Sequence, residues 1–388
     1  MSVRAVTGLP VLSALEVALG QPVGTVAPRA TAVDPDPVHA VRAALLPALV
    51  RSPCVVAFSG GRDSSLLLAL AADLAAREGL DPPVAVTFRY PGDPAADESD
   101  WQELVVAHLK ERGLPVDWVR HDVTTELDLI GPLTAPVLRA HGHPTYPAAL
   151  GNTLLLSRYA RGGALVTGNG GDEVLGGHRI AVLRAVARRR GRGLTAADRR
   201  LVAVCVAPAL VRGALAFREA GDAAWLRPAA RRVALAEAVR TARTRPLRWD
   251  RSVWGALAPR AVTIGAATRT RVVDAAGALL VEPLSDPAFV ASYASFRGRW
   301  GALTRTAGMR LLAAGLLPEN VLGRRDKAAF NSSRFGPLSR AFARTWDGQG
   351  VDERLVDPVA LRAAWLSELP PPATAMLLQQ AWLSGFAA

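Results

Sequence analysis

Lysine, cysteine and aromatic residues are scarce in this sequence of 388 residues. Lys110 and Lys327 are the only lysines among 46 basic residues, so each is a candidate for a role that arginine would not fill. The two cysteines, Cys54 and Cys205, lie in apolar surroundings without the spacing of metal ligands. We therefore expect buried, inert thiols and no cysteine-based metal site.

The sequence also has no long uninterrupted apolar run. Its longest apolar window, residues 201–217, is broken by Pro208 and Arg212, which favours a buried helix over a membrane span. The N-terminal segment has one arginine in its first 20 residues and a weak apolar stretch that contains Glu16, which makes a poor signal peptide. With half of its residues hydrophobic, the chain is expected to be a globular cytoplasmic protein with a large core and no membrane partner.

Negative charge is depleted in the second half of the chain. The net charge is +12, and 33 of the 46 basic residues but only 15 of the 34 acidic residues follow residue 178. No aromatic residue interleaves with the densest arginine run, residues 178–200, so a surface that stacks nucleic-acid bases is not indicated. We expect a solvated arginine-rich face there, with docking of an acidic partner or peptide as the alternative.

Short apolar segments alternate with amphipathic ones in residues 36–178, after an N-terminal arm at 1–35. Strands are expected at 54–58, 84–88, 116–119 and 164–167, with helices at 39–50, 65–78, 99–112 and 153–161. This alternation predicts an α/β fold with a parallel sheet covered on both faces. Residues 179–388 are predicted to be mainly helical, apart from a hairpin at 268–283 that turns at Gly277.

The segment SGGRDSS lies between the first strand and the next helix. Glycines, hydroxyls and a helix N-terminus in this order favour a phosphate, and the predicted contacts are Ser59, Gly60, Gly61, Ser64 and Ser65. Asp63 would repel a phosphate unless a divalent cation lay between them, so it is predicted as a Mg²⁺ ligand. Phe88, which ends the second strand, is predicted as a further nucleotide contact. A turn that binds nothing is the alternative.

Other phosphate-binding motifs are missing. No Gly-Lys pair exists for a Walker loop, and GxGxxG is absent from the first strand-helix turn. SGGRDSS instead resembles the pyrophosphate-binding loop of the PP-loop ATP pyrophosphatases. The resemblance implies ATP as cofactor and AMP-forming chemistry, in which ATP adenylates a substrate and pyrophosphate leaves.

A second glycine-rich loop follows the strand expected at 164–167. It contributes Gly168, Gly170 and Gly171 as predicted nucleotide contacts, and Asp172 as a predicted metal ligand beside Asp63. This loop resembles the GxGxDExxGG pattern of asparagine synthetase-like enzymes, matched by Gly168, Gly170, Asp172, Glu173, Gly176 and Gly177. The implied fold is the PP-loop, or adenine nucleotide α-hydrolase-like, parallel sheet followed by a helical part.

Three further segments extend the resemblance to residues 38–345. They are DESDWQELVVAHLKERGLPV at 97–116, VEPLSDPAFV at 281–290, in which Ser285 interrupts the family's PFLD, and LLPENVLGRRDKAAF at 316–330. The last resembles the element that carries the family's active-site lysine, which makes Lys327 a predicted catalytic residue near the α-phosphate. A surface lysine beside a helix is the alternative at Lys327, and is our interpretation of Lys110.

The sequence departs from asparagine synthetases in two places. The family's glutaminase domain of roughly two hundred residues has no counterpart before the first loop, so we expect free ammonia, a separate amine-supplying partner, or an amine on the substrate. Asn169 stands where the amide-forming relatives usually have an acid, and an amide cannot accept a proton at neutral pH. Either the base is one of Glu173, His178, His141 and His143, or the amine arrives unprotonated; Glu173 and His178 are the predicted catalytic residues.

These observations predict an ATP-dependent amide synthase of the asparagine synthetase type. It would adenylate a carboxylate and pass it to an amine, tailoring a small molecule or peptide as the relatives that close β-lactam and lasso-peptide macrolactam rings do. One alternative is a tRNA-modifying PP-loop enzyme, which the basic second half favours and the absence of a catalytic cysteine pair opposes. A catalytically degenerate relative that serves as a partner protein is the other.

Overall fold

The structure is a computed structural model. It describes residues 6–28, 33–91, 96–188, 195–219, 221, 223–324 and 334–386. Lys327, the predicted catalytic lysine, lies outside the described residues.

A five-stranded parallel sheet forms the centre of the fold. Its strands are β1 (Cys54–Ala57), β2 (Val84–Arg89), β3 (Asp117–Asp122), β4 (Ala164–Val166) and β5 (Leu279–Val281), in the order β3-β2-β1-β4-β5. All neighbouring pairs are parallel, with Val55 opposite Val84 on one side of β1 and Leu165 on the other. The predicted α/β fold is confirmed, and the order places β1 at the middle of the sheet.

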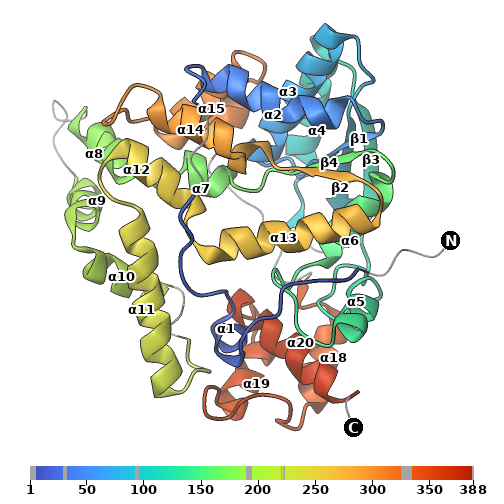
Figure 1. Cartoon of the computed structure of the whole chain (residues 1–388), viewed down its shortest axis with the longest axis vertical. Helices are drawn as coiled ribbons and strands as arrows, with labels where there is room; N and C mark the ends of the chain where they lie inside the picture. Colours follow the sequence, from blue (N-terminus) through green and yellow to red (C-terminus); the bar gives the residue numbers. More distant parts are fainter. Residues whose placement is uncertain are drawn as a thin grey trace.

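Helices cover both faces of this sheet, as the alternation predicts (Figure 1). On one face, Cys54, Val56 and Val166 pack into a large core with α2 (Pro37–Leu49), α3 (Arg62–Glu78) and α4 (Ser99–Glu111). On the other face, Val55 and Leu165 pack against α6 (Gly151–Tyr159) and α13 (Arg260–Ala275). Successive strand residues thus point to opposite cores, which is why the central strands β1 and β4 are apolar throughout rather than alternating.

The hairpin predicted at 268–283 is wrong. Residues up to Ala275 belong to α13, whose buried Thr268, Val272 and Val273 follow helical spacing. Gly277, with φ of 73°, turns the chain after this helix, and β5 then joins β4 in parallel. A parallel neighbour requires a long crossover, which α13 provides, so the fifth strand comes from the part of the chain predicted to be helical.

The rest of the second half is helical, as predicted. The remaining helices are α5 (Thr134–His141), α7 (Gly171–Leu175), α8 (Arg179–Ala187), α9 (Ala196–Val206), α10 (Ala209–Glu219), α11 (Pro228–Thr244), α12 (Trp249–Trp254), α14 (Pro287–Ser295), α15 (Arg305–Ala313), α16 (Glu319–Gly323), α18 (Pro337–Thr345), α19 (Pro358–Leu366) and α20 (Ala375–Ser384). The last three pack with α1 (Ala14–Leu19) of the N-terminal arm around a second core that includes Trp365 and Met376. The α1 part of the arm therefore packs against the C-terminal helices, as Figure 1 shows at the bottom of the view, while Val6 and Leu9 pack against Val272 of α13.

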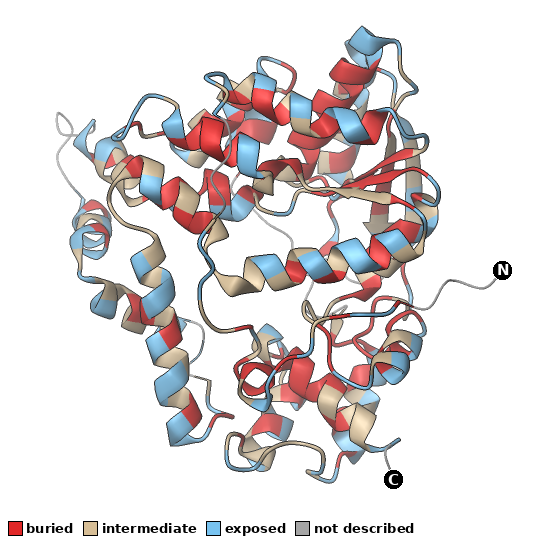
Figure 2. Ribbon diagram, viewed as in Figure 1, coloured by how far each residue is buried: buried red, intermediate tan, exposed pale blue. Residues whose placement is uncertain are grey.

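The apolar window at 201–217 is not one buried helix. It divides into α9 and α10 at Pro208, which has no amide hydrogen for a continuous helix. Leu201, Val206 and Leu210 are exposed, and Figure 2 shows this edge of the molecule mostly tan and pale blue. In the described part of the chain, no single helix has the length and apolar composition needed to cross a membrane. Only α9 and α10 taken together, bent by 120°, reach that threshold.

Candidate functional site

The two glycine-rich loops lie side by side at the carboxyl ends of β1 and β4. The chain runs from β1 to β2 and β3 on one side of the sheet and continues with β4 and β5 on the other. The order therefore reverses between β1 and β4, and such a switch point leaves a crevice in which α/β proteins bind ligands.

Ser64 holds the first loop in its tight conformation. Its hydroxyl donates to the Gly61 carbonyl at 3.0 Å and accepts from the Ser59 amide at 3.2 Å. Gly60 has a φ of 81°, and a Cβ there would lie 2.9 Å from Cγ of Gln102, so both conformation and space call for glycine. α3 begins at Arg62 rather than near residue 65, which places Asp63 in its first turn.

Partners outside the loop bind its carbonyl groups. Gln102 donates to the Ser59 carbonyl at 3.2 Å, and Arg324 donates to the Gly60 carbonyl at 3.1 Å. Arg324 is buried, forms a two-pronged ion pair with Glu98, and stacks 4.6 Å above the Trp101 ring. Because these side chains hydrogen-bond the loop's carbonyl groups, they hold the backbone in place while Ser59 remains exposed to solvent.

The loops touch each other at Asp63. A Cβ on Gly171 would lie 2.6 Å from Oδ2 of Asp63, and one on Gly168 would lie 3.2 Å from its Cβ. Gly170 has a φ of 92° and approaches Ser285 so closely that a Cβ would lie 2.6 Å from the serine Cβ. The glycines of the second loop are thus required by the position of Asp63 and of the segment after β5.

Arg305 joins the two predicted metal ligands. Its guanidinium donates to Oδ2 of Asp63 at 2.6 Å and also bonds Oδ1 of Asp172. Burial raises the pKa of Asp63, and the charge of Arg305 opposes that rise. Two carboxylates from two different loops therefore share one cation at the switch point.

These carboxylates suit Mg²⁺. Both are hard oxygen ligands, and Oδ1 of Asp63 is buried without a hydrogen-bond partner. No group of three or more His, Cys, Asp or Glu side chains in the described residues forms a metal site by itself. Mg²⁺ is usually held by one or two carboxylates together with substrate phosphates and water, so Asp63 and Asp172 could hold it jointly with a nucleotide.

Asn169 bonds a carboxylate that the sequence reasoning missed. Its Nδ2 donates to Oε1 of Glu282 at 2.7 Å and to the Thr167 hydroxyl at 2.8 Å. Glu282 follows β5 and accepts two further bonds from Arg269, at 2.7 and 2.9 Å. An acid is thus present beside Asn169, although it comes from another strand.

The two predicted catalytic residues after the second loop differ in access. Glu173 is exposed, and Arg245 donates to its backbone carbonyl at 3.2 Å. His178 is 2% exposed, with Nδ1 3.0 Å from the Ser252 hydroxyl and Nε2 2.7 Å from the Val174 carbonyl. Burial lowers the pKa of His178 to about 4. This geometry gives His178 a packing role and does not support it as a base.

Ser65 and Phe88, two further predicted contacts, are fully and partly buried. The Ser65 hydroxyl is fully buried and has no hydrogen-bond partner, and Phe88 packs edge-to-face with His121 in the partly buried end of β2. His141, the last residue of α5, packs edge-to-face against His143 in the loop that follows, with ring centroids 5.4 Å apart. Glu282 lies in the segment 281–290 that resembles the family, but nothing in that pattern marked it as a site residue, and Arg305 and Arg269 lie in no motif.

Such a fold, with glycine-rich loops paired at the switch point, defines an α/β protein that binds a phosphorylated ligand at the carboxyl edge of its sheet. Within that class, the chain belongs to the asparagine synthase family, whose model matches residues 39–384. The family supports an ATP-dependent ligase that forms amide bonds, and its enzymes use ATP, generally with Mg²⁺. A comparison with curated proteins found no match.

Proposed function

We propose that this ligase is AMP-forming: it adenylates the carboxylate of a small molecule or peptide and transfers the acyl group to an amine. The observation that carries this proposal is the contact between the loops, in which Asp63 packs against Gly171 and shares a cation with Asp172. Without a cation between them, these carboxylates would repel the phosphates of ATP. Two carboxylates at the edge of a phosphate-binding loop therefore suit a nucleotide that binds together with a divalent cation.

In the proposed reaction, a substrate carboxylate oxygen attacks the α-phosphorus of ATP, and the bond to the β-phosphate oxygen breaks. Pyrophosphate leaves into the loop formed by Ser59, Gly60, Gly61 and Ser64, at the N-terminus of α3. When bound, Mg²⁺ would neutralise charge on the pyrophosphate. Lys327 is proposed to bind the α-phosphate, and Phe88 to contact the nucleotide. The amine nitrogen then attacks the acyl carbon, and AMP leaves.

The attacking amine must lose a proton. Glu282 is poorly placed to take it, because its carboxylate oxygens are already occupied by hydrogen bonds from Arg269, Asn169 and Thr167. We propose that Glu282 positions Asn169, and that the exposed carboxylate of Glu173 accepts the proton. Asn169 would then contact the acyl group through its carboxamide oxygen.

Tailoring of a small molecule or peptide is proposed over asparagine synthesis because of Asn169. The amide-forming relatives usually have an acid there, whereas ring-closing relatives can have tyrosine. A neutral side chain at this place favours an amine that is delivered in unprotonated form or carried by the substrate itself. A separate protein that supplies the amine or carries the substrate would serve the same purpose.

The test supplies ATP and Mg²⁺ with pools of candidate carboxylates, peptides or tRNA, and measures pyrophosphate release followed by mass analysis of the product. An amide product with AMP supports the proposal. Modified tRNA would favour the alternative that the basic second half suggests. Absence of turnover in both the wild type and Asp63→Ala would favour a degenerate partner protein.

A further inference from the structure

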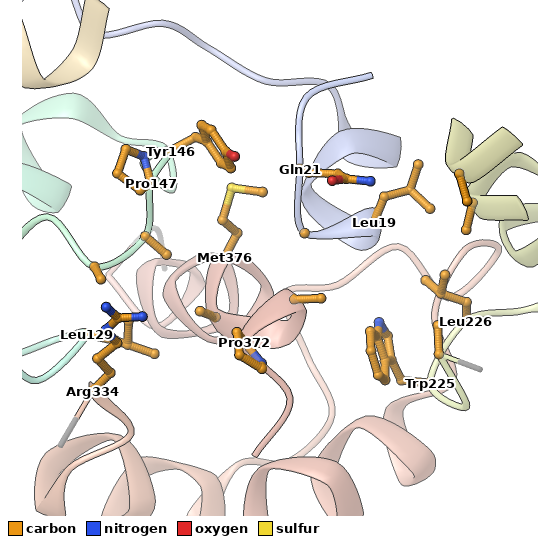
Figure 3. A pocket seen from close by; sticks show the side chains of 18 of the residues that line it. Leu19, Gln21, Leu129, Tyr146, Pro147, Trp225, Leu226, Arg334, Pro372 and Met376 are labelled. Carbon is orange, nitrogen blue, oxygen red and sulfur yellow. The ribbon is translucent and has the colours of Figure 1, made fainter. Parts of the chain in front are cut away.

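A cavity of about 520 Å³ lies between the N-terminal arm and the C-terminal helices (Figure 3). Its walls come from six parts of the chain: the end of α1 with the arm after it, the segment between β3 and α5 at Leu129, the loop between α5 and α6, the helices α10 and α11 with the turn between them, the segment at Arg334, and the start of α20. The volume lies within the range of small-molecule binding sites.

The arm forms a fixed wall of this cavity. Gly20, with φ of 73°, lies so close to the turn before α20 that a Cβ would lie 2.5 Å from Cα of Ala373. The Trp225 indole donates to the Ala18 carbonyl at 3.3 Å, and the Gly24 amide donates to Glu237 at 3.0 Å. These contacts tie the arm to α11 and α20, so the cavity belongs to the folded chain rather than to a loose segment.

The lining is chiefly apolar. Its larger members are Leu19, Leu129, Phe217, Trp225, Leu226 and Met376. Figure 3 shows the Tyr146 and Met376 side chains on one side of the opening and Trp225 on the other. Polar groups are few, so most of an occupant must be apolar.

Arg334 brings a positive charge to this apolar wall. Figure 3 shows its side chain reaching along Leu129, and its Nε is buried without a hydrogen-bond partner. Burial lowers the pKa of the guanidinium, and no carboxylate of the described residues bonds it. Arg269, Arg305 and Arg324, by contrast, each bond a carboxylate. A cation in such surroundings is stabilised by an anion, and an anionic group on a ligand would supply one.

Tyr146 connects the cavity to the second glycine-rich loop. A Cβ on Gly265 would lie 3.6 Å from Cε1 of Tyr146 and 3.0 Å from Nη1 of Arg269, the partner of Glu282. The Glu173 carboxylate is close enough to contribute to the raised pKa of Tyr146, although burial is the main cause. A molecule in the cavity thus lies next to the groups that the proposed reaction uses.

We propose that this cavity binds the apolar body of the substrate, an amphiphilic carboxylate, and that Arg334 bonds an anionic group on it. This inference rests on the proposed function and adds the substrate class. It makes the N-terminal arm part of the binding site, because Leu19, Gly20 and Gln21 line the cavity.

Isothermal titration of the full chain with decanoate, decanol and decylammonium tests the inference. We expect decanoate to bind about tenfold tighter than decanol, as a charge-assisted bond to Arg334 predicts, and decylammonium to bind weakest. Arg334→Gln should remove the preference for decanoate over decanol, and Arg334→Lys should retain part of it. Ala238→Phe, which fills the cavity from α11, should weaken both ligands more than tenfold.

A second apolar cavity of about 320 Å³, lined by Val137, Ala140 and Leu154, supplies the matched control. Ala140→Phe fills that cavity and should leave decanoate binding unchanged. Equal binding of the three probes, or decanoate binding lost in Ala140→Phe but kept in Ala238→Phe, would overturn the inference. Thermal unfolding of each variant establishes that it is folded, and Arg334→Gln tests the charge independently if Ala238→Phe does not fold.

Nucleotide products separate this inference from the proposed function. If a carboxylate substrate yields AMP, and Ala238→Phe and Arg334→Gln leave its KM unchanged, the cavity assignment fails while the proposed function stands. If the probes bind as expected but no carboxylate yields AMP, the cavity assignment stands and the proposed function fails.

Discussion

Arg305 donates from Nη2 to Oδ2 of Asp63 at 2.6 Å, across 242 positions of sequence. The same guanidinium bonds Asp172, so it lies between the two carboxylates that are proposed to bind Mg²⁺. A positive charge in the first turn of α15 interacts unfavourably with the positive end of the helix dipole, and the two carboxylates offset this interaction. Nucleotide and metal must therefore compete with Arg305 for these oxygens.

Removal of Arg305 should strengthen metal binding. In Arg305→Met, both carboxylates are free of the competing cation, and we expect Mn²⁺, used in place of Mg²⁺, to bind several-fold tighter in the absence of nucleotide. Electron paramagnetic resonance of free Mn²⁺ measures this. Arg310→Met is the matched control on the same helix, because Arg310 pairs with Glu319 on the exposed surface. Unchanged or weaker binding in Arg305→Met would remove Asp63 and Asp172 from the metal site.

Metal binding should begin to weaken at a higher pH than it would at a site built from exposed aspartates. Burial raises the pKa of Asp63, so protons compete with the metal at a higher pH than usual. Mn²⁺ affinity of the wild type should fall as the pH falls toward the raised pKa, and Asp63→Asn should bind weakly at every pH. A parallel decline in both proteins would show that another group governs the pH dependence.

Gly171→Ala should strongly reduce the activity of the enzyme while leaving it folded. The new Cβ would lie 2.6 Å from Oδ2 of Asp63, so the carboxylate and the loops must move apart. A shift of about 1 Å at a catalytic site can reduce the rate by about a hundredfold, and we expect a loss of that size in kcat/KM. Gly385→Ala, at the exposed end of α20, has room for a Cβ and should retain full activity. Equal activities of the two variants would refute the close contact.

His178 should make the fold sensitive to acid. Burial lowers its pKa from 6.5 to about 4, so the folded state excludes a proton that the unfolded chain accepts. Its contribution to stability is full above the unfolded pKa of 6.5 and is lost as the pH falls to about 4, which amounts to about 3 kcal/mol. Urea unfolding at several pH values should give a shallower pH dependence for His178→Gln than for the wild type. His143→Gln, at an exposed position, should resemble the wild type, and a wild-type slope in His178→Gln would contradict the packing role.

Local sequence patterns placed the first four strands because apolar residues between helices mark each of them, although β3 (Asp117–Asp122) extends into polar residues beyond the predicted 116–119. The fifth strand was misassigned to a hairpin because Arg269 and Arg271 alternate with Thr270 and Val272 as strand residues would, although all four lie on α13. Only the parallel pairing of Leu279–Val281 with β4 reveals that α13 belongs to the crossover between these two strands. Strand pairing is a tertiary property, and a local pattern does not contain it.

The site was predictable in part for a similar reason. Glycines and carboxylates of the two loops form compact motifs, so Asp63, Asp172 and Gly170 could be identified from spacing. Arg305 bonds Asp63 from 242 positions away and Glu282 bonds Asn169 from 113 positions away, and local spacing does not reveal such partners. His178 looked like a candidate base in the sequence because its burial between Trp249, Ser252 and Val174 becomes visible only in the folded chain.

The nucleotide product tests the central claim most directly. Wild-type protein with ATP, Mg²⁺, a carboxylate substrate labelled with ¹⁸O and an amine should yield AMP and pyrophosphate, with one labelled oxygen transferred to the phosphate of AMP. Phosphorus NMR distinguishes the products, and mass spectrometry locates the label. Formation of ADP with labelled inorganic phosphate would contradict the account, because the carboxylate would then have attacked the γ-phosphorus.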